Sequence, residues 1–571
     1  MTFFRVWAPR ARRVDLVLGG AERHALSGPD ELGWFAGEAE ASAGDDYAYS
    51  LDGGDPRPDP RSAWQPEGVH GPSRLVDHSA FAWTDSGWAG GAPLAEAVVY
   101  ELHVDTFSEA ETYEGAIGHL DHLVDLGVTH VELLPVVEYP GRWGWGYDGV
   151  DLYAPNSGDG GPEGLKRLVD ACHGRGLAVI FDVVYNHLGP AGNYLGEYGP
   201  YFTDRYGTPW GEAVNLDGAD SDPVREFVLD NALMWLRDYH VDGLRLDAVH
   251  AIVDTSATHI LEELAGRVDA LEAELGLPKS LIAESDLNDP RVVADPSVGG
   301  YGMDAQWSDD LHHALHAALI GERAGYYADF GSLAQLAKAL RHAFVYDGGY
   351  SLYRRRRHGR TPAGIPLTRF LGYLQNHDQV GNRAKGERSS MLLSDGLLKV
   401  AAALVLLGPS VPMPFQGEEW AASTPFLYFT DHEDPALGKA VTEGRRREFA
   451  AFGWSPDDVP DPQDPETFKR SKLRWDELSE PRHAGMLDWH RRLIALRRSA
   501  PAGDVAVEVD EEARWLVVRR GPMTISCNVG DRPATVPAGP GKLVLSSAEG
   551  VTGAGDRVEL PAESVIVWMG R

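Results

Sequence analysis

The sequence predicts an α/β protein built on a (β/α)8 TIM barrel, with one β-sandwich before the barrel and a second after it. Three observations support this fold class. Four short apolar segments end in clusters of polar side chains, and helical stretches separate these segments. At both ends of the chain, apolar and polar residues alternate, as they do in strands. In a (β/α)8 barrel the carboxyl ends of the strands meet at one face, where active sites lie. We therefore expect a single site there.

The length of the chain requires more than one core. A compact domain rarely reaches 571 residues, so several domains are expected. Short alternating runs between Gly- and Pro-rich turns indicate β-sandwiches at both ends of the chain. We expect three domains, which are a β-sandwich at residues 1–88, a barrel with long loop insertions at 94–500 and a β-sandwich at 503–571.

Eight barrel strands can be placed in chain order. They are expected at residues 98–104, 129–136, 178–181, 241–250, 281–284, 305–310, 371–374 and 402–407. The stretch 188–219 is too long for a plain linker, so we expect a functional lid there. The stretch 430–465, rich in Asp, Pro and Glu, is expected to be a polar loop. The proline-rich stretch 57–73 is hard to place in a sheet and is expected to cross from the first sandwich to the barrel.

The charge balance excludes some classes of partner. The chain carries 52 basic and 86 acidic side chains, a net charge of −34. Such a field repels nucleic acids and anionic membranes, so neither is expected as a partner, whereas a neutral sugar is compatible with it. No export signal or membrane-spanning run is apparent, which predicts a cytoplasmic protein. Cys172 and Cys527 lie in different predicted domains and are expected to be reduced and buried.

The fourth strand carries an unusual pair of charges. Within Val241–His250 the alternation places Arg245 and Asp247 on the same face of the strand. Burying either ion alone is costly, so we expect the two to pair. For one isolated strand, a structural ion pair is the simplest interpretation. Three more strands end in similar polar clusters, at residues 182–187, 284–286 and 375–383, and this recurrence favours one catalytic site.

The four clusters resemble a known family. The stretches DVVYNH, GLRLDAVH, AESD and QNHD are similar to the four short motifs of the α-amylase family of retaining glycoside hydrolases, in that family's order. Each motif alone is weak, but four in order are specific. The resemblance implies an oligosaccharide substrate and a catalytic triad of Asp247, Glu284 and Asp378.

Retaining hydrolysis explains why three carboxyl groups are required. A nucleophile and an acid must flank the bond, about 5–5.5 Å apart. Asp247 stands two residues from an arginine, which favours the ionised nucleophile. Glu284 follows three apolar residues and lies near other carboxylates, so its pKa should be raised as an acid requires. Asp378 would hold the hydroxyls of the distorted sugar and stabilise its developing positive charge.

Further residues are expected to bind the sugar. Tyr147 matches the family's tyrosine that stacks under the sugar being cleaved. The expected binding residues are Tyr147, His187, Arg245, His250, Asp286, His377, Gln379 and Arg383. Asn288, Arg291 and Asn382 are also placed by sequence toward the leaving side. Trp143 and Trp145 could stack on a sugar or pack beneath their loop. The run Arg354–His358 could pair with carboxylates or bind hydroxyl groups.

No metal or cofactor is expected. Asp182 and Asn186 match positions that help bind calcium in some amylases, but the remaining ligands are not apparent. The histidines have neighbours too scattered in sequence for a tight metal site.

A longer resemblance narrows the activity. QPEGVHGPS, FDVVYNHLGPAGNYL, LIAESDLNDPRVV and YLQNHDQVGNRA are similar to the maltooligosyltrehalose trehalohydrolases, and the N-terminal stretch resembles their early-set β-sandwich. This implies cleavage of the α-1,4 bond next to a terminal trehalose unit, with release of trehalose. A branching enzyme, a general α-1,4-glucan hydrolase and a non-enzymatic binding protein are the alternatives. The last is disfavoured because all three carboxylates are present. Asp105 and the turn 157–160 depart from the pattern, which puts subsite preference in question.

Overall fold

The centre of the molecule is a parallel barrel of eight strands. The computed structural model describes the whole chain except residues 209, 452–454, 501–502, 550, 552–554 and 571. The strands follow one another in chain order around the sheet. They are β8 (Val99–Leu102), β9 (His130–Leu133), β12 (Ala178–Val183), β15 (Gly243–Leu246), β16 (Ser280–Ala283), β17 (Ala305–Trp307), β20 (Phe370–Gly372) and β21 (Val411–Pro412). The amide of Glu101 on β8 donates to Pro414 O at 3.0 Å, which closes the ring beyond β21. The expected (β/α)8 fold is confirmed.

The barrel interior is filled with apolar side chains. Val99, Ile180, Ile282 and Leu371, from β8, β12, β16 and β20, are completely buried and lie in one cluster with Trp307. A packed interior of large apolar side chains is typical of this architecture and leaves no pore. Substrate therefore has to bind at the rim.

The eighth strand was placed wrongly by sequence. The apolar run at 402–407 belongs to helix α12 (Asp395–Leu406), whereas the strand is only the pair Val411–Pro412. Ser394 caps the helix, because its hydroxyl accepts from the Leu397 amide at 3.2 Å. Alanine and leucine favour helices, and periodicity alone cannot separate a buried helix from a buried strand.

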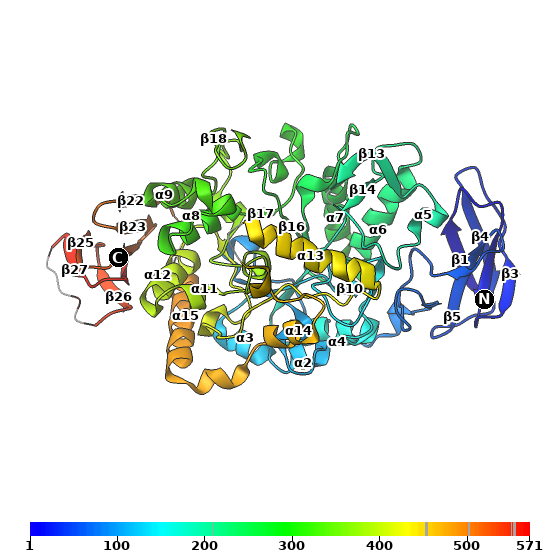
Figure 1. Ribbon diagram of the computed structural model, residues 1–571, viewed down its shortest axis with the longest axis horizontal. Helices are drawn as coiled ribbons and strands as arrows, with labels where there is room; N and C mark the ends of the chain where they lie inside the picture. Colours follow the sequence, from blue (N-terminus) through cyan, green and yellow to red (C-terminus); the bar gives the residue numbers. More distant parts are fainter. Residues whose placement is uncertain (209, 452–454, 501–502, 550, 552–554, 571) are drawn as a thin grey trace.

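Helices surround the barrel and cover its outer face (Figure 1). The longer ones are α4 (Gly161–His173), α6 (Asp222–Asp238), α7 (Ile260–Leu275), α8 (Asp309–Leu319), α9 (Leu333–His342) and α15 (Pro481–Ser499). Shorter helices are α1 (Val104–Phe107), α2 (Tyr113–Ile117), α3 (Leu120–Leu126), α10 (His377–Gly381), α11 (Ser389–Leu392) and α14 (Pro465–Ser471). Within the described chain, no helix is long and apolar enough to cross a lipid bilayer.

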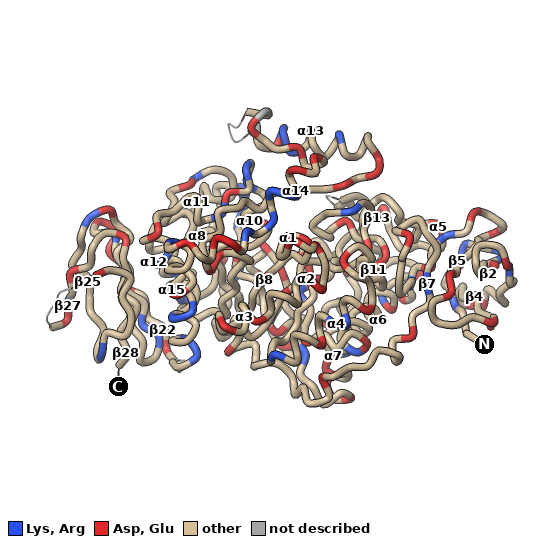
Figure 2. Tube along the Cα trace, turned by 90° about the horizontal axis from the view of Figure 1, so that it is seen from below, with Lys and Arg blue, Asp and Glu red and all other residues tan. Residues whose placement is uncertain are grey.

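Two long stretches at the mouth of the barrel contain regular structure. The expected lid includes α5 (Leu195–Tyr198) and the hairpin β13 (Phe202–Thr208) and β14 (Gly211–Val214). The stretch expected to be a polar loop instead contains α13 (Pro435–Ala451), which stands above the body of the barrel in Figure 2. Proline suits the first turn of a helix, and good helix formers follow it, so composition alone misled that expectation.

The N-terminal segment forms two small antiparallel sheets. One pairs β1 (Thr2–Trp7) with β4 (Trp34–Ala39), and the rings of Phe4 on β1 and Tyr47 on β5 join it to the other, with centroids 5.3 Å apart. The second sheet has β2 (Val14–Leu18), β3 (Glu22–Ala25), β5 (Asp46–Leu51), β6 (Pro56–Arg57) and β7 (Ser73–Arg74). Both ends of the proline-rich stretch thus pair with β5, contrary to expectation. Its middle reaches the barrel, where Trp64 Nε1 donates to Ser157 Oγ at 3.1 Å.

The C-terminal segment is also β-structured. Its sheets are built from β22 (Val505–Asp510), β23 (Trp515–Arg520), β24 (Met523–Asn528), β26 (Lys542–Ser546) and β28 (Ser564–Met569), and from the pair β25 (Ala534–Pro537) and β27 (Arg557–Leu560). Val517 and Ile566 pack against Val536 and Leu560 between these sheets. The N-terminal and C-terminal sheets lie at opposite ends of the molecule in Figure 1. We retain 1–88, 94–500 and 503–571 as proposed domain limits. Cys172 and Cys527 are both free and buried.

Candidate active site

One buried arginine organises the strand ends. Arg245 on β15 is fully buried, and its Nη1 donates to Asp182 Oδ2 at 2.5 Å and to Asp247 Oδ1 at 3.0 Å. Its Nη2 lies 3.1 Å from Glu284 Oε2. The guanidinium carbon is 4.1 Å from the centre of the Trp307 ring, which covers one side. A single cation therefore holds three carboxyl groups from neighbouring strands, and the expected pairing of Arg245 with Asp247 is observed.

Asp247 is fixed through both of its oxygens. Its Oδ1 accepts from Arg245, and its Oδ2 accepts from Asn186 Nδ2 at 2.7 Å. The same amide also donates to the main-chain carbonyl of Asp247 at 2.9 Å. Charge-assisted hydrogen bonds of this kind are strong and directional, so the carboxylate has one orientation.

Glu284 lies in a setting that favours its neutral form. Its side chain is only 15% exposed, and its Oε2 accepts from the Ala248 amide at 2.7 Å. Burial raises the pKa of Glu284 well above its ordinary value; Arg245 opposes this, while Asp247 adds to the increase. The side chain can therefore hold a proton at neutral pH, as an acid catalyst must.

Asp378 is the most open of the three expected carboxylates. It lies in the first turn of α10, which Asn376 caps by accepting from the Gln379 amide at 3.1 Å. Its side chain is 38% exposed, and its Oδ1 is 3.3 Å from Asn382 Nδ2 and 3.5 Å from His377 Nε2. The cap thus positions a carboxylate that remains accessible to a ligand.

His377 is charged by its surroundings. Its Nδ1 lies 2.5 Å from Glu101 Oε1, and its Nε2 lies 2.8 Å from the Tyr147 hydroxyl. Burial alone would lower the pKa of His377, but the carboxylates of Asp378 and Glu101 outweigh it and raise this pKa to about 9. The Tyr147 hydroxyl in turn donates to Asp182 Oδ2 at 2.6 Å. Sequence reasoning missed Glu101; its only signal was a lone glutamate within an apolar strand.

His187 is held between two oxygen acceptors. Its Nδ1 pairs with Asn186 Oδ1, and its Nε2 is 3.0 Å from the carbonyl of Tyr147. Burial lowers the pKa of His187. Its ring stacks on Trp210 at 4.4 Å between centroids. Trp210 is 48% exposed and therefore offers its other side to a ligand. Trp210 belongs to the stretch 188–219, which the sequence indicated only as an expected lid.

The two positions that match a calcium site are used differently here. Asp182 Oδ2 accepts from Arg245 and Tyr147. Asn186 donates to Asp247 and accepts from His187. Among the described residues, no group of three or more His, Cys, Asp or Glu side chains is arranged to hold a metal ion.

A cavity of about 410 Å³ opens above these groups. It is lined by Tyr147, His187, Trp210, Asp247, His250 and Glu284, among others. Trp145 also lines it, and its Nε1 donates to Leu427 O at 3.0 Å while its ring stacks on Phe426. Trp143 instead stacks on Phe468 at 5.4 Å and lies outside the cavity lining. The packing interpretation therefore holds for Trp143, whereas Trp145 combines packing with a place at the site.

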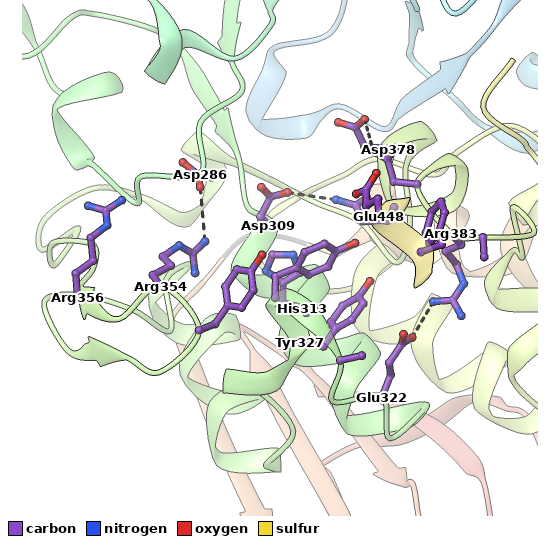
Figure 3. A pocket seen from close by; sticks show the side chains of 18 residues that line it. Asp286, Asp309, His313, Glu322, Tyr327, Arg354, Arg356, Asp378, Arg383 and Glu448 are labelled. Carbon is purple, nitrogen blue, oxygen red and sulfur yellow. Dashed lines mark hydrogen bonds and ion pairs between the residues drawn. The ribbon is translucent and has the colours of Figure 1, made fainter. Parts of the chain in front are cut away.

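A second cavity, of about 640 Å³, adjoins the first (Figure 3). Asp378 and Asn382 line both cavities, so the two share one wall. The second is lined mainly by charged and aromatic side chains, including Asp286, Asp309, His313, Tyr327, Arg354 and Arg383. Asp247 and Glu284 line the first cavity only, whereas Asp378 lies at the wall between the two.

The expected leaving-side residues divide into two groups. Asp286, Gln379 and Arg383 line the second cavity, together with Asn382. Asn288 and Arg291 line neither cavity: Asn288 Nδ2 donates to Asp310 at 2.8 Å, and Arg291 pairs with Asp289 at 2.6 Å. Loop residues close to the site in sequence can point away from it, which sequence alone cannot show.

The arginines of the second cavity have carboxylate partners. Arg383 Nη1 donates to Glu322 at 2.7 Å, and its Nε is 3.5 Å from Glu387. Arg354 lies 3.7 Å from Asp286. Figure 3 shows the Arg383–Glu322 and Arg354–Asp286 pairs as dashed lines. Both arginines therefore pair with carboxylates and also line the cavity, and their contact with a sugar stays a prediction.

The two positions that depart from the family pattern, Asp105 and the turn 157–160, are in contact. Asp105 and Asp159 are buried, and their side chains are hydrogen-bonded. Burial raises the pKa of Asp105 to about 6, and burial together with Asp105 raises the pKa of Asp159. Neither residue lines either cavity. The expectation that these departures bear on subsite preference therefore receives no support from the cavity linings.

A parallel barrel that carries Asp247, Glu284 and Asp378 at the carboxyl ends of its strands has the general arrangement of a barrel glycosidase. Residues 103–201 match the family described as "Alpha amylase, catalytic domain", and residues 500–567 match a domain of unknown function, DUF3459. A malto-oligosyltrehalose trehalohydrolase from Rhizobium sp. (strain M-11) is 51% identical, over 99% of this chain and 97% of the relative. A glucan branching enzyme from Corynebacterium jeikeium is 32% identical over only 54% of this chain.

A solved structure shares the fold of the whole chain. The crystal structure of an alpha amylase from Salmonella typhimurium is 38% identical and superposes with a TM-score of 0.91, covering 100% of this chain and 97% of that chain. The chain belongs to the malto-oligosyltrehalose trehalohydrolase family, whose members are glycosidases with the α-amylase catalytic domain.

Proposed function

We propose that the protein hydrolyses the α-1,4-glucosidic bond next to the terminal trehalose unit of maltooligosyl trehalose and releases trehalose. In this reaction Asp247 attacks the anomeric carbon, and Glu284 gives its proton to the leaving trehalose oxygen. Water then cleaves the glycosyl–Asp247 ester, with Glu284 acting as base. Asp378 binds the hydroxyls of the distorted sugar and stabilises its positive charge.

The contacts of the three carboxyl groups support these roles. Asp247 is oriented by Arg245 and Asn186, and Glu284 has a raised pKa. The guanidinium of Arg245 contacts the proposed nucleophile through Nη1 and the proposed acid through Nη2, so one cation holds both groups. His377, whose pKa is about 9, would donate to a sugar hydroxyl or maintain the charge of Asp378.

The observation that carries the substrate proposal is the pair of cavities that share Asp378 and Asn382. The glucan chain would occupy the 410 Å³ cavity, where Tyr147 and Trp210 offer rings for stacking. The leaving trehalose would occupy the 640 Å³ cavity. An α,α-1,1-linked disaccharide is bent and has no reducing end, so polar groups placed for it are mispaired by maltose, at a considerable energetic cost.

Product analysis tests this proposal. Maltooligosyl trehalose and a maltodextrin of equal length are compared at equal concentration. We expect trehalose as the main small product, and a kcat/KM higher by about 100-fold or more for the trehalose-ended substrate, as expected when buried polar groups are satisfied by only one ligand. Equal kcat/KM values for the two substrates would leave a general α-1,4-glucan hydrolase as the activity.

Arg383→Ala separates recognition from bracing. If Arg383 contacts trehalose, the preference for the trehalose-ended substrate falls while hydrolysis of maltodextrin is retained. If it only braces Glu322 and Glu387, both activities and the thermal midpoint fall together. Incubation with long amylose tests the alternative of branching, because new α-1,6 linkages would identify a transferase.

A further inference from the structure

A cavity of about 1050 Å³ lies at the end of the barrel opposite to the active site. Its lining includes Thr129, Thr368 and Pro409, which stand just before strands β9, β20 and β21. Val505 and Arg520 of β22 and β23 line it from the other side. The cavity therefore lies between the base of the barrel and the C-terminal sheet.

Four arginines converge on this cavity. They are Arg341 at the end of α9, Arg497 and Arg498 at the end of α15, and Arg520 on β23. Among the described residues, none of the four has a carboxylate within 4.0 Å. The chain has 86 acidic side chains against 52 basic ones, so four unpaired arginines around one cavity need an explanation. Figure 2 shows basic positions lying together near α15 and β22.

Two of the arginines are buried side by side. Arg497 and Arg520 are each 7% exposed, and their Nη1 atoms donate to the same carbonyl oxygen, that of Gly408, at 2.9 and 2.8 Å. They also donate to the carbonyls of Leu406, Leu407 and Ser410. Two like charges held this close repel each other, and burial increases that repulsion. A bound anion would remove it.

A purely structural role explains only part of this arrangement. Carbonyls at the carboxyl end of α12 attract cations, which accounts for the Nη atoms that bind them. It does not account for Arg520 Nε, which is buried and, within the described chain, has no hydrogen-bond partner. It also does not account for Arg341 and Arg498, which are exposed and make no ion pair with a described carboxylate. Glu96 and Asp504 line the cavity as well, but neither lies within 4.0 Å of any of these arginines.

We propose that this cavity binds a phosphate-bearing anion, either inorganic phosphate or the phosphoryl group of a small organic phosphate. Guanidinium groups present rigid pairs of donors that match phosphate oxygens, and a dianion would balance the two buried charges. The cavity is larger than a phosphate ion needs, and Ile365, Pro366 and Leu367 form an apolar wall beside the arginines. The ligand would bridge the barrel and the C-terminal sheet, and so stabilise their contact.

Binding is tested on the full chain in a phosphate-free buffer. Inorganic phosphate and a hexose phosphate are titrated by calorimetry, with potassium chloride at equal ionic strength as the control. We expect saturable binding of at least one phosphate and a rise of the thermal midpoint that chloride does not produce. If the hexose phosphate binds tenfold more tightly than inorganic phosphate, the ligand is an organic phosphate. Equal affinities of the two would identify inorganic phosphate. Absence of binding beyond the chloride control overturns the proposal.

Variants locate the site. Arg520→Gln should weaken phosphate binding by about tenfold or more, since a buried charged hydrogen-bond donor is lost. Arg341→Ala and Arg498→Ala should each weaken it by about threefold, and their exposed positions avoid a folding defect. Arg12→Ala, whose side chain is 92% exposed and remote from the cavity, is the matched control. Unchanged affinity in both exposed variants overturns the proposal, even if Arg520→Gln fails to fold.

Discussion

At the scale of single residues, Arg245 determines how the site carries its charge. Asp182, Asp247 and Glu284 all contact this one guanidinium. Three negative charges around one positive charge cannot all be favourable in a buried site, so one carboxyl group keeps its proton. Burial raises the pKa of Asp182 to about 6, and it raises the pKa of Glu284 well above its ordinary value. The cluster thus separates two proposed roles, with Asp247 as the nucleophile and Glu284 as the acid.

Glu284→Gln tests that separation. The variant should lose about 1000-fold or more in kcat/KM on glucan substrates, because their leaving oxygen needs a proton. On an aryl glucoside with an activated leaving group, the loss in the glycosylation step should be about tenfold or less. Asp247→Asn is the comparison, since loss of the nucleophile should abolish turnover of both substrates. Similar losses for Glu284→Gln on the two substrates would exclude Glu284 as the acid.

Glu101→Gln tests the charge of His377. Removal of the carboxylate 2.5 Å from Nδ1 should lower the pKa of His377 from about 9, so the alkaline limb of the kcat/KM profile moves to lower pH. In the wild type, the raised pKa stabilises the fold fully below pH 6.5, and this stabilisation is lost as the pH rises through about 9. Glu31→Gln, at an exposed position, should leave the profile unchanged. An unshifted alkaline limb in Glu101→Gln would show that His377 does not control it.

The sequence indicated many residues of the proposed site, but not the residues that hold them in position. Asp247, Glu284 and Asp378 follow strands or begin a short helix, so their clustering followed from the barrel alone. Glu101 could not be found in this way, because one buried glutamate in a strand has no periodic signal. Arg291 illustrates the opposite error: it is close to Glu284 in sequence, yet it pairs with Asp289. Side-chain direction in loops depends on tertiary contacts that local sequence does not contain.

At the scale of elements, α10 packs closely on the loop that carries Trp145. A Cβ atom at Gly381 would lie 2.0 Å from Trp145 Cζ2 and 2.1 Å from Cη2. Only glycine therefore permits the present contact between the helix and the indole. Since Trp145 lines the first cavity, the packing of α10 positions part of the site.

Gly381→Ala should therefore disturb both stability and activity. Overpacking of this kind costs about 1–3 kcal/mol, and the displaced indole should lower kcat/KM. The free energy of unfolding from denaturant titration and the kinetics on the natural substrate measure the two effects. Gly266→Ala, in α7 with nothing within 4 Å of the added methyl group, should be neutral or slightly stabilising. Wild-type behaviour of Gly381→Ala would mean that Trp145 can move without consequence.

The limits of sequence reasoning are also visible in the elements. Seven barrel strands were located because each joins an apolar run to a polar cluster or to a turn. The eighth is two residues long, and the longer apolar run before it is the buried helix α12. A strand so short is defined by its neighbours β20 and β8 rather than by its own residues.

At the scale of the whole molecule, the segment that joins the N-terminal sheets to the barrel is fixed by two histidines. Asp85 Oδ2 lies 2.8 Å from His173 Nδ1 and 2.8 Å from His240 Nδ1. His173 Nε2 is 3.0 Å from Asp242, and Trp88 stacks on the His173 ring at 4.4 Å. One imidazole thus connects the joining segment to strand β15, through a residue just before it.

His173→Leu should weaken this connection in a pH-dependent way. Burial alone would lower the pKa of His173, but Asp242 and Asp85 raise it, and His173 lowers the pKa of both carboxyls. The histidine's contribution is full below pH 6.5 and is lost at higher pH; that of the carboxylates is full above pH 3.8 and is lost at lower pH. The substitution should lower the free energy of unfolding by about 3 kcal/mol or more, and this loss should be greatest between pH 3.8 and pH 6.5.

Denaturant titrations at pH 5.5, 7 and 9 measure this difference. His342→Leu, on the exposed side of α9, is the control and should change stability little at any of these values. A destabilisation of His173→Leu that is equal at pH 5.5 and 9 would mean that packing, rather than charge, holds the segment.

The wall shared by the two cavities has a kinetic consequence. A released disaccharide that stays in the second cavity remains in contact with Asp378 and Asn382, so it should slow the next turnover and act as a product inhibitor. If the second cavity holds trehalose, the other product has lost the group that directed its cleavage. Each glucan chain is then cut once and is not shortened processively, so the reaction ends when the supply of trehalose-capped ends is exhausted.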